Sequence, residues 1–188
     1  MAVRRIELRG LNEALATLDP AIALKASVRT INELIKQSRT ATSNEIRKNY
    51  TVKAAQLKKH MKTHLMSASG KPGKLVVTGN RFALTSFAAT RQVKAGVSVK
   101  IKQIGSRKTI KHTFLTTVTK GPASGTKLAF ERVVRGGKRV GRLPIQHVTS
   151  LGPVAMFNQD RVDDVVQSLV DDKWDPVFRR NYAYYASR

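Results

Sequence analysis

The chain has 188 residues and carries 35 Lys and Arg against 12 Asp and Glu, a formal net charge of +23. Its 41% hydrophobic residues are enough for a folded core, which excludes a disordered basic tail. It contains no cysteine, which excludes disulfides and cysteine metal sites and agrees with folding in a reducing compartment. It has no long apolar run, and its N-terminal residues alternate charged with apolar side chains. We therefore expect neither a signal peptide nor a membrane span.

The positive charge is concentrated in the middle of the chain. Residues 71–150 hold 17 Lys and Arg and a single acid, Glu131. Residues 1–70 hold 13 basic and 5 acidic side chains, and residues 151–188 hold 5 and 6. So much charge of one sign repels itself unless phosphates or carboxylates neutralise it. The composition indicates a polyanionic partner: nucleic acid, an acidic lipid surface or an acidic protein face, with double-stranded nucleic acid as the first expectation.

The first region, residues 1–66, is predicted to be helical. Asp19 and Pro20 have the residue types of a helix cap and a first helical position, and they predict one long amphipathic helix from Pro20 to about Lys48. A shorter helix is expected over 11–18. The apolar stripe of the long helix is formed by Leu24, Val28, Ile31 and Ile35.

A brief helix is expected after Tyr50, with Leu57 and Met61 pointing inward. His60 and His64 would lie four residues apart on it, a spacing that can hold a metal ion. The glutamate of a zinc-protease motif is missing, however, and the neighbouring lysines oppose a cation. We therefore expect no metal site.

The second region, residues 67–157, is predicted to be a basic antiparallel sheet of about four or five strands. The Ser, Gly and Pro residues of 67–73 break the helical pattern and indicate a linker or hinge. Alternation from Val97 to Ile101 predicts a strand whose wet face carries Ser98, Lys100 and Lys102. The remaining strands are expected at 75–78, at 109–118 after a turn at 105–108, and at 128–134 and 140–145, joined by the tip 135–139.

The third region, residues 158–188, is predicted to be helical again. Asp175 and Pro176 indicate a cap and a first position that begin a second turn or helix. The first helix has an apolar stripe formed by Val162, Val165, Val166, Leu169 and Val170. The expected fold class is α+β, with long N-terminal helices, a central antiparallel sheet and a C-terminal amphipathic helix. We expect one compact domain with helical arms.

The candidate binding surface combines the tips of the predicted hairpins with nearby strand cations. Glycine at such tips lets a polyanion approach the backbone closely. The alternative is a solvated cationic face that only keeps the protein soluble. Aromatic residues are sparse there, so duplex backbone binding fits better than stacking on single strands. The candidate residues are Lys100, Lys102, Arg107, Lys108, Lys111, Arg135, Lys138, Arg139 and Arg142.

Nothing in the sequence indicates an enzyme or a cofactor. Residues 121–127 superficially resemble a phosphate-binding loop, but their spacing is one residue short and Lys127 follows the threonine. No serine, histidine and carboxylate are grouped for catalysis. The tyrosines near the C-terminus, beside Arg179 and Arg180, indicate either a docking tail for a neighbouring subunit or a last helix packed on its own domain.

Three elements, taken in order, resemble the phage minor tail protein Z family of tail completion proteins. They are the long N-terminal helix with Asn32 and the Arg39-Thr40 step, the strand that begins at Gly96, and the motif formed by Arg142, Leu143, Pro144 and Ile145 with Gly152 and Pro153 after it. The resemblance spans about residues 6–185. One departure is that the family often has Gly-Pro-Ser where this chain has Gly152-Pro153-Val154.

The resemblance implies a virion component at the head-proximal end of the tail, assembled in the host cytoplasm as a ring, with six-fold symmetry as the usual tail symmetry. Its partners would be copies of itself, tail terminator, tail tube or head–tail connector proteins, and double-stranded DNA, with no membrane. A globule of 188 residues is about 40 Å across, so a ring of six would meet on the order of four phosphates per subunit. Most of the charge would then face acidic neighbours or solvent. The alternatives are a free, sequence-independent DNA-binding protein, or a tail terminator or connector.

Overall fold

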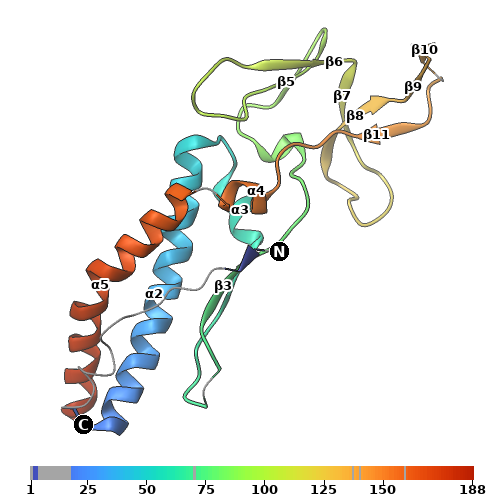
Figure 1. Ribbon diagram of the computed structural model, residues 1–188. Coiled ribbons are helices and arrows are strands. Elements are labelled where there is room, and N and C mark those ends of the chain that lie inside the picture. The colour runs from blue at the N-terminus through green and yellow to red at the C-terminus, as the bar shows by residue number, and fades with distance from the viewer. Residues whose placement is uncertain (1, 4–17, 70, 137, 140, 159) are drawn as a thin grey trace. The chain divides into compact units, whose positions relative to one another are not determined.

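The chain folds into two compact units, each assembled from separate segments. The computed structural model describes residues 2–3, 18–69, 71–136, 138–139, 141–158 and 160–188, with side chains for all of these except 2, 3, 135, 138, 139 and 160. Unit 1 comprises 1–45, 58–78 and 157–188, and unit 2 comprises 46–57 and 79–156. Of the helix predicted at 11–18, residues 11–17 lie outside the described residues. The α+β fold class is confirmed (Figure 1).

The long helix α2 (Pro20–Asn49) begins and ends as the sequence predicts. The Asp19 carboxylate accepts hydrogen bonds from the backbone N–H groups of Ala21 and Ile22, at 2.9 and 3.1 Å, which caps the first turn. Arg47 and Lys48 lie in the last turn, where positive charge is favourable beside the carbonyl end of the helix dipole.

The buried face of α2 is not the predicted apolar stripe. Leu24 is 48% exposed, and the other stripe residues are only half-buried. The buried face instead combines Leu34 with small residues: Ala23, Ala26, Ser27, Thr30 and Ser38. Small side chains let a neighbouring helix approach closely, and periodicity of large apolar residues does not reveal such a face.

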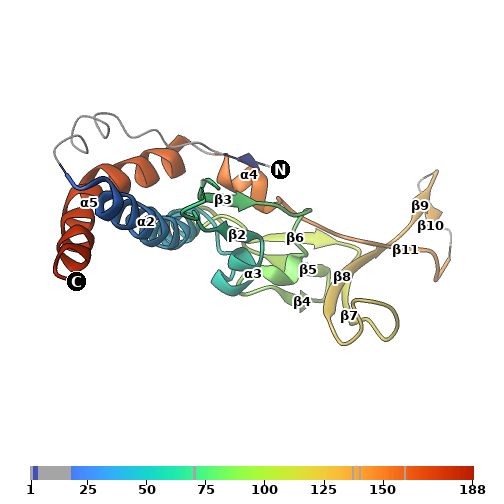
Figure 2. The same ribbon diagram turned by 90° about the horizontal axis from the view of Figure 1, so that it is seen from below.

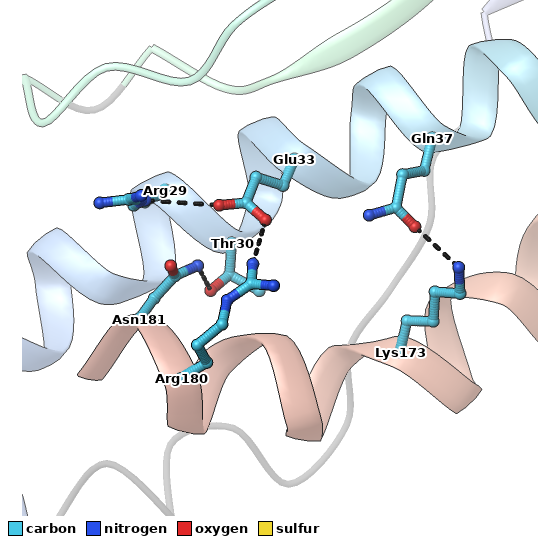
Figure 3. Close-up of polar contacts among 7 residues, drawn as sticks. All are labelled: Arg29, Thr30, Glu33, Gln37, Lys173, Arg180 and Asn181. Atoms are coloured by element: carbon cyan, nitrogen blue, oxygen red, sulfur yellow. Dashed lines mark hydrogen bonds and ion pairs between the residues drawn. The ribbon is translucent and has the colours of Figure 1, made fainter. Parts of the chain in front are cut away.

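Helix α5 (Asp160–Ala186) lies alongside α2 within unit 1 and runs in the opposite direction (Figures 1 and 2). The buried Asn181 amide donates to the Thr30 hydroxyl at 3.0 Å. Toward the other end of the pair, the Lys173 ammonium donates to the Gln37 amide oxygen at 3.1 Å (Figure 3). These polar contacts fix the register of the two helices.

The predicted break at Asp175-Pro176 is wrong, because α5 continues through Pro176. Proline removes one backbone donor from a helix interior and normally ends or kinks the helix. Here Val170 precedes the proline and Val177 and Phe178 follow it, and all three side chains are buried. Their burial against unit 1 favours a continuous helix over the local preference of proline.

A three-stranded antiparallel sheet completes unit 1. Strand β3 (Lys74–Val77) pairs on one side with β2 (Met61–His64) and on the other with β1 (Ala2–Val3). Residues 67–69 and 71–73, part of the segment predicted as a linker or hinge, therefore lie in the loop of the β2–β3 hairpin. No helix of the described residues combines the length and apolarity needed to cross a membrane.

The β2–β3 hairpin is fastened to α2 by Asn32. Its amide donates to the Met66 carbonyl at 3.0 Å and accepts from the Met66 N–H at 2.7 Å. Gly73, at the other side of the same loop, lies so close to Ile35 and Ile31 that a Cβ there would overlap the Ile35 side chain. These contacts explain why Ile31 and Ile35 face the hairpin rather than α5.

We expect Asn32→Ala to destabilise unit 1 by about 2 kcal/mol, because it leaves both backbone groups of Met66 without their partners. Asn44→Ala is the matched control, since Asn44 is an exposed residue of the same helix. Urea unfolding measures the free energy of unfolding of the two variants. It can be followed by the fluorescence of the single tryptophan, Trp174, which lies in unit 1. Equal midpoints for the two variants would contradict the proposed role of Asn32.

Unit 2 contains several small antiparallel sheets instead of one sheet of four or five strands. In the first, β5 (Gly96–Val99) lies between β4 (Arg91–Val93) and β6 (Lys108–Lys111). In the second, β8 (Lys127–Arg132) lies between β7 (Thr113–Thr117) and β11 (Ile145–His147). The hairpin of β9 (Val134–Arg135) and β10 (Lys138–Arg139) contains the predicted tip. The short helices are α3 (Ala54–Lys59), the 3-10 helix η1 (Leu84–Ser86) and α4 (Pro153–Phe157).

The predicted strand 109–118 is divided at His112. This residue has a φ of 61°, a conformation that ends the extended ladder, so Lys108–Lys111 and Thr113–Thr117 belong to different sheets. The buried Thr113 hydroxyl then joins the two sheets, because it accepts from the Val97 N–H at 3.0 Å and donates to the Ile110 carbonyl at 2.6 Å. The predicted strand at 140–145 is also wrong, since β11 begins only at Ile145.

Candidate polyanion-binding surface

The two units divide the charge of the chain very unequally. Unit 2 carries 18 Lys and Arg and one acid, a formal charge of +17. Unit 1 carries 17 basic and 11 acidic side chains, a formal charge of +6. The ion pairs Arg29–Glu33, Arg180–Glu33 and Arg179–Asp175 all lie within unit 1. The hydrogen bond from Arg179 to Asp175 raises the pKa of that guanidinium, which therefore stays charged.

The one side-chain carboxylate of unit 2, that of Glu131, already accepts a hydrogen bond. Glu131 lies opposite Gln146 in the β8–β11 ladder, and the Gln146 amide donates to its carboxylate. One carboxylate cannot neutralise 18 cations, so unit 2 presents a strongly positive surface to whatever lies beside it.

Two exposed cations lie on the same face of the β4–β5–β6 sheet. In the antiparallel register Arg91 is opposite Ser98, and Lys111 is opposite Gly96. Directly paired residues share a face, and residues two apart along a strand share a face. Arg91 on β4 and Lys111 on β6 therefore flank the face that contains Ser98. They are about 10 Å apart across the sheet and about 7 Å apart along it, which gives a separation of about 12 Å. We name Arg91, Arg107 and Lys111 the sheet-face cations.

The third sheet-face cation, Arg107, has a structural task as well. Its Nε donates to the Ser98 hydroxyl at 3.1 Å, and a terminal nitrogen donates to the Ala89 carbonyl. The side chain covers Ser98, which is 6% exposed, so the predicted wet face of this strand is covered by a guanidinium. The acceptors of Arg107 are neutral. Its charge thus remains uncompensated and adds to the potential beside Arg91 and Lys111.

The strand register does not place the other predicted strand cations on this face. Lys108 pairs with Val99 and so belongs to the opposite face of the sheet from Lys111. The backbone carbonyl of Lys100 accepts from the Thr51 hydroxyl, and Lys102 forms an isolated bridge with Tyr50. The structure therefore brings together only part of the predicted set.

The remaining predicted cations belong to a projecting arm, residues 133–136, 138–139 and 141–144, in which the β9–β10 hairpin extends beyond the β7–β8–β11 sheet (Figure 2). Arg142 is exposed on it. The side chains of Arg135, Lys138 and Arg139 lie outside the described residues.

The residues of the motif Arg142–Ile145 and Gly152–Pro153 have structural positions. Leu143 is 69% exposed and precedes Pro144 through a cis peptide bond, and Ile145 pairs with Arg132. At Gly152, a Cβ would lie 3.2 Å from the Asn80 carbonyl oxygen, so glycine allows a close approach of the two segments. Pro153 is buried as the first residue of α4. The motif shapes unit 2 rather than presenting polar groups, apart from Arg142.

The histidine pair does not have the predicted geometry. Helix α3 ends at Lys59, and His64 belongs to strand β2, so His60 and His64 are not four residues apart on one helix. Within the described residues, no three histidines or carboxylates gather in a way that could hold a metal ion.

Sequence reasoning missed Arg91, because strand β4 was not expected. The β4–β5 hairpin turns through Lys94 and Ala95, and this pair has none of the Asn-Gly or Asp-Gly character that marks tight hairpins. Val93 is the one β-branched residue of this strand, and a single such residue is too weak a signal to predict a strand. Gln92 is also important, because its amide oxygen accepts from the Leu115 N–H at 2.7 Å and so links the two sheets.

Comparisons with known proteins found no match: no family model, no curated protein and no solved structure is similar to this chain.

Proposed function

We propose that this protein is a non-enzymatic structural component that binds a polyanionic partner through the basic surface of unit 2. The observation that supports the proposal is the segregation of charge, +17 on a unit that contains one carboxylate. Such a unit is stable at high charge density only when a partner or counterions neutralise it. Double-stranded DNA is the preferred partner, because its phosphates are spaced regularly enough to meet cations held on a rigid sheet.

The sheet-face cations match the spacing of a duplex backbone. Successive phosphates of one DNA strand rise about 3.4 Å along the axis, so cations about 12 Å apart meet phosphates about three to four steps apart. Contacts of this type neutralise phosphates and read no bases. We therefore propose binding that is independent of sequence.

The proposed place of action follows from the resemblance to the minor tail protein Z family. We propose that the protein completes the phage tail as a homo-oligomeric ring, a hexamer, at the head-proximal end, where tail terminator, tail tube or head–tail connector proteins and DNA would be its neighbours. The helices of unit 1, which carry a more balanced charge, would supply the contacts between subunits. The rival is a free DNA-binding protein that acts as a monomer.

Electron microscopy of the protein mixed with purified phage tails tests this proposal. We expect rings, or added density at one end of each tail, and gel filtration of the protein should show an oligomer. Monomers that decorate DNA along its length and ignore tail ends would support the rival and overturn the proposed place of action.

A further inference from the structure

Neither face of the β7–β8–β11 sheet of unit 2 is fully covered. On one face Thr113 and Ala129 are buried, whereas Thr117, Lys127 and Gln146 are exposed. The register places a different set of residues on the opposite face, and all of them are half-buried or exposed. This second face, which we name the open face, consists of Phe114, Thr116, Leu128, Phe130, Arg132, Ile145 and His147.

Three rings form a row across the strands of the open face. Phe114, Phe130 and His147 are direct cross-strand neighbours. The ring centroids of Phe114 and Phe130 are 6.3 Å apart, and those of Phe130 and His147 are 5.7 Å apart. The planes are tilted by 34° and 48°, so the rings lie side by side instead of stacking on one another. Phe114 and Phe130 are half-buried and His147 is exposed, so part of each of these side chains is accessible to a ligand.

The charge around the ring row has one sign. The Arg132 guanidinium lies over the Phe114 ring, 5.3 Å from its centroid. The only carboxylate of unit 2, Glu131, lies on the opposite face of the sheet, because it pairs with Thr113 and Gln146. A ligand on the open face thus meets rings and a cation but no acid.

We propose that the open face of this sheet binds unpaired nucleic acid, with bases stacked on the ring row and phosphates neutralised by Arg132 and neighbouring cations. Single-strand binders combine aromatic platforms with positive charge in this way. A duplex cannot use the rings, because its bases are already stacked, and an acidic peptide would use the charge but offers few flat π faces. The inference rests on the proposed polyanion binding of unit 2 and adds a second kind of ligand at a separate face.

Fluorescence anisotropy with a labelled 12-nucleotide oligothymidylate and a 12-base-pair duplex tests the inference. We expect Phe130→Ala to weaken binding of the single strand about tenfold or more, since stacking contributes about 1–3 kcal/mol per base, and to change duplex binding less than twofold. Phe130→Tyr keeps a ring and should retain most of the single-strand affinity. Unlabelled poly-glutamate should compete poorly with the oligothymidylate.

A second variant keeps the test decisive if Phe130→Ala does not fold. His147 is exposed at the end of the row, so His147→Ala should fold normally and weaken single-strand binding several-fold. The inference is overturned if neither variant affects single-strand binding, if both ligands weaken equally, or if poly-glutamate competes as well as DNA. If the unaltered protein binds the oligothymidylate but not the duplex, and the ring variants weaken oligothymidylate binding, the proposed duplex function fails while the ring row stays supported.

Discussion

Replacing Gly96 by alanine is expected to destabilise unit 2 by about 4 kcal/mol. Gly96 has a φ of 154°, and a Cβ there would overlap the carbonyl oxygen of Ile110 on the neighbouring strand. The backbone strain costs about 1–3 kcal/mol, and the steric overlap costs a similar amount. Because β5 is the central strand of its sheet and every residue in it is buried, the sheet cannot relax by moving the strand outward.

Gly105→Ala is the matched control for strain alone. Gly105 has a φ of 103°, but a Cβ there would meet nothing within 4 Å. We expect this variant to cost about 1–2 kcal/mol. Urea unfolding followed by circular dichroism gives both values, and hydrogen exchange of residues 91–111 localises the change to the β4–β5–β6 sheet. If the two variants unfold at the same urea concentration, the close packing of Gly96 on Ile110 is not what holds this sheet.

Reversal of two sheet-face cations, Arg91→Glu with Lys111→Glu, is expected to weaken duplex binding on the order of 100-fold at low salt. Each lost phosphate contact should also reduce the slope of log affinity against log salt by about one. Arg107 is left unchanged in this variant, because its bonds to Ser98 and Ala89 support the sheet itself.

The control for net charge is Lys25→Glu with Arg161→Glu. Both residues are exposed cations of unit 1, so this variant has the same total charge as the sheet-face variant. We expect it to lose only a few-fold in affinity, since long-range charge acts weakly through salt. Equal losses in the two variants would show that net charge, and not the sheet face, determines binding.

The elements that the sequence predicts well are those whose signals are local. Asp19 and Pro20 mark the start of α2 because a cap and a fixed φ act within one turn. The alternation of Val97 and Val99 with Ser98 predicts β5 for the same reason. Glycine at position 96 was not recognised as a packing constraint, because the clash involves Ile110 on another strand.

The features that could not be predicted depend on tertiary contacts. Pro176 lies inside a helix because buried neighbours on both sides hold it there. The division at His112 depends on the bonds of Thr113, which belongs to β7, to Val97 and Ile110 of the other sheet, and no residue type at this position signals a positive φ as glycine would. Periodicity predicted the wrong face for α2, because small residues such as Ala26 are buried and Thr30 bonds to Asn181 of α5.

The sequence predicted that the candidate surface of unit 2 is rich in Lys and Arg, but it did not predict which of these residues share a face of the sheet. Lys111 was among the predicted residues and lies on the sheet face, but its neighbour Arg91 was missed with strand β4. Arg107 was expected at a free tip, whereas its side chain is engaged with Ser98. The ring row was also missed, because Phe114 and Phe130 come together only through strand pairing, and linear counting finds few aromatic residues here.

The dependence of duplex affinity on salt concentration tests the central claim most directly. If the basic surface of unit 2 neutralises about four phosphates, log affinity should fall with log salt at a slope of about −3.6, which is about a 150-fold loss between 50 and 200 mM salt. The sheet-face variant should show a slope shallower by about two. Absent binding at 50 mM salt, or a slope between zero and −1 for the unaltered protein, would show that the lysines and arginines of unit 2 are merely solvated and would contradict the account.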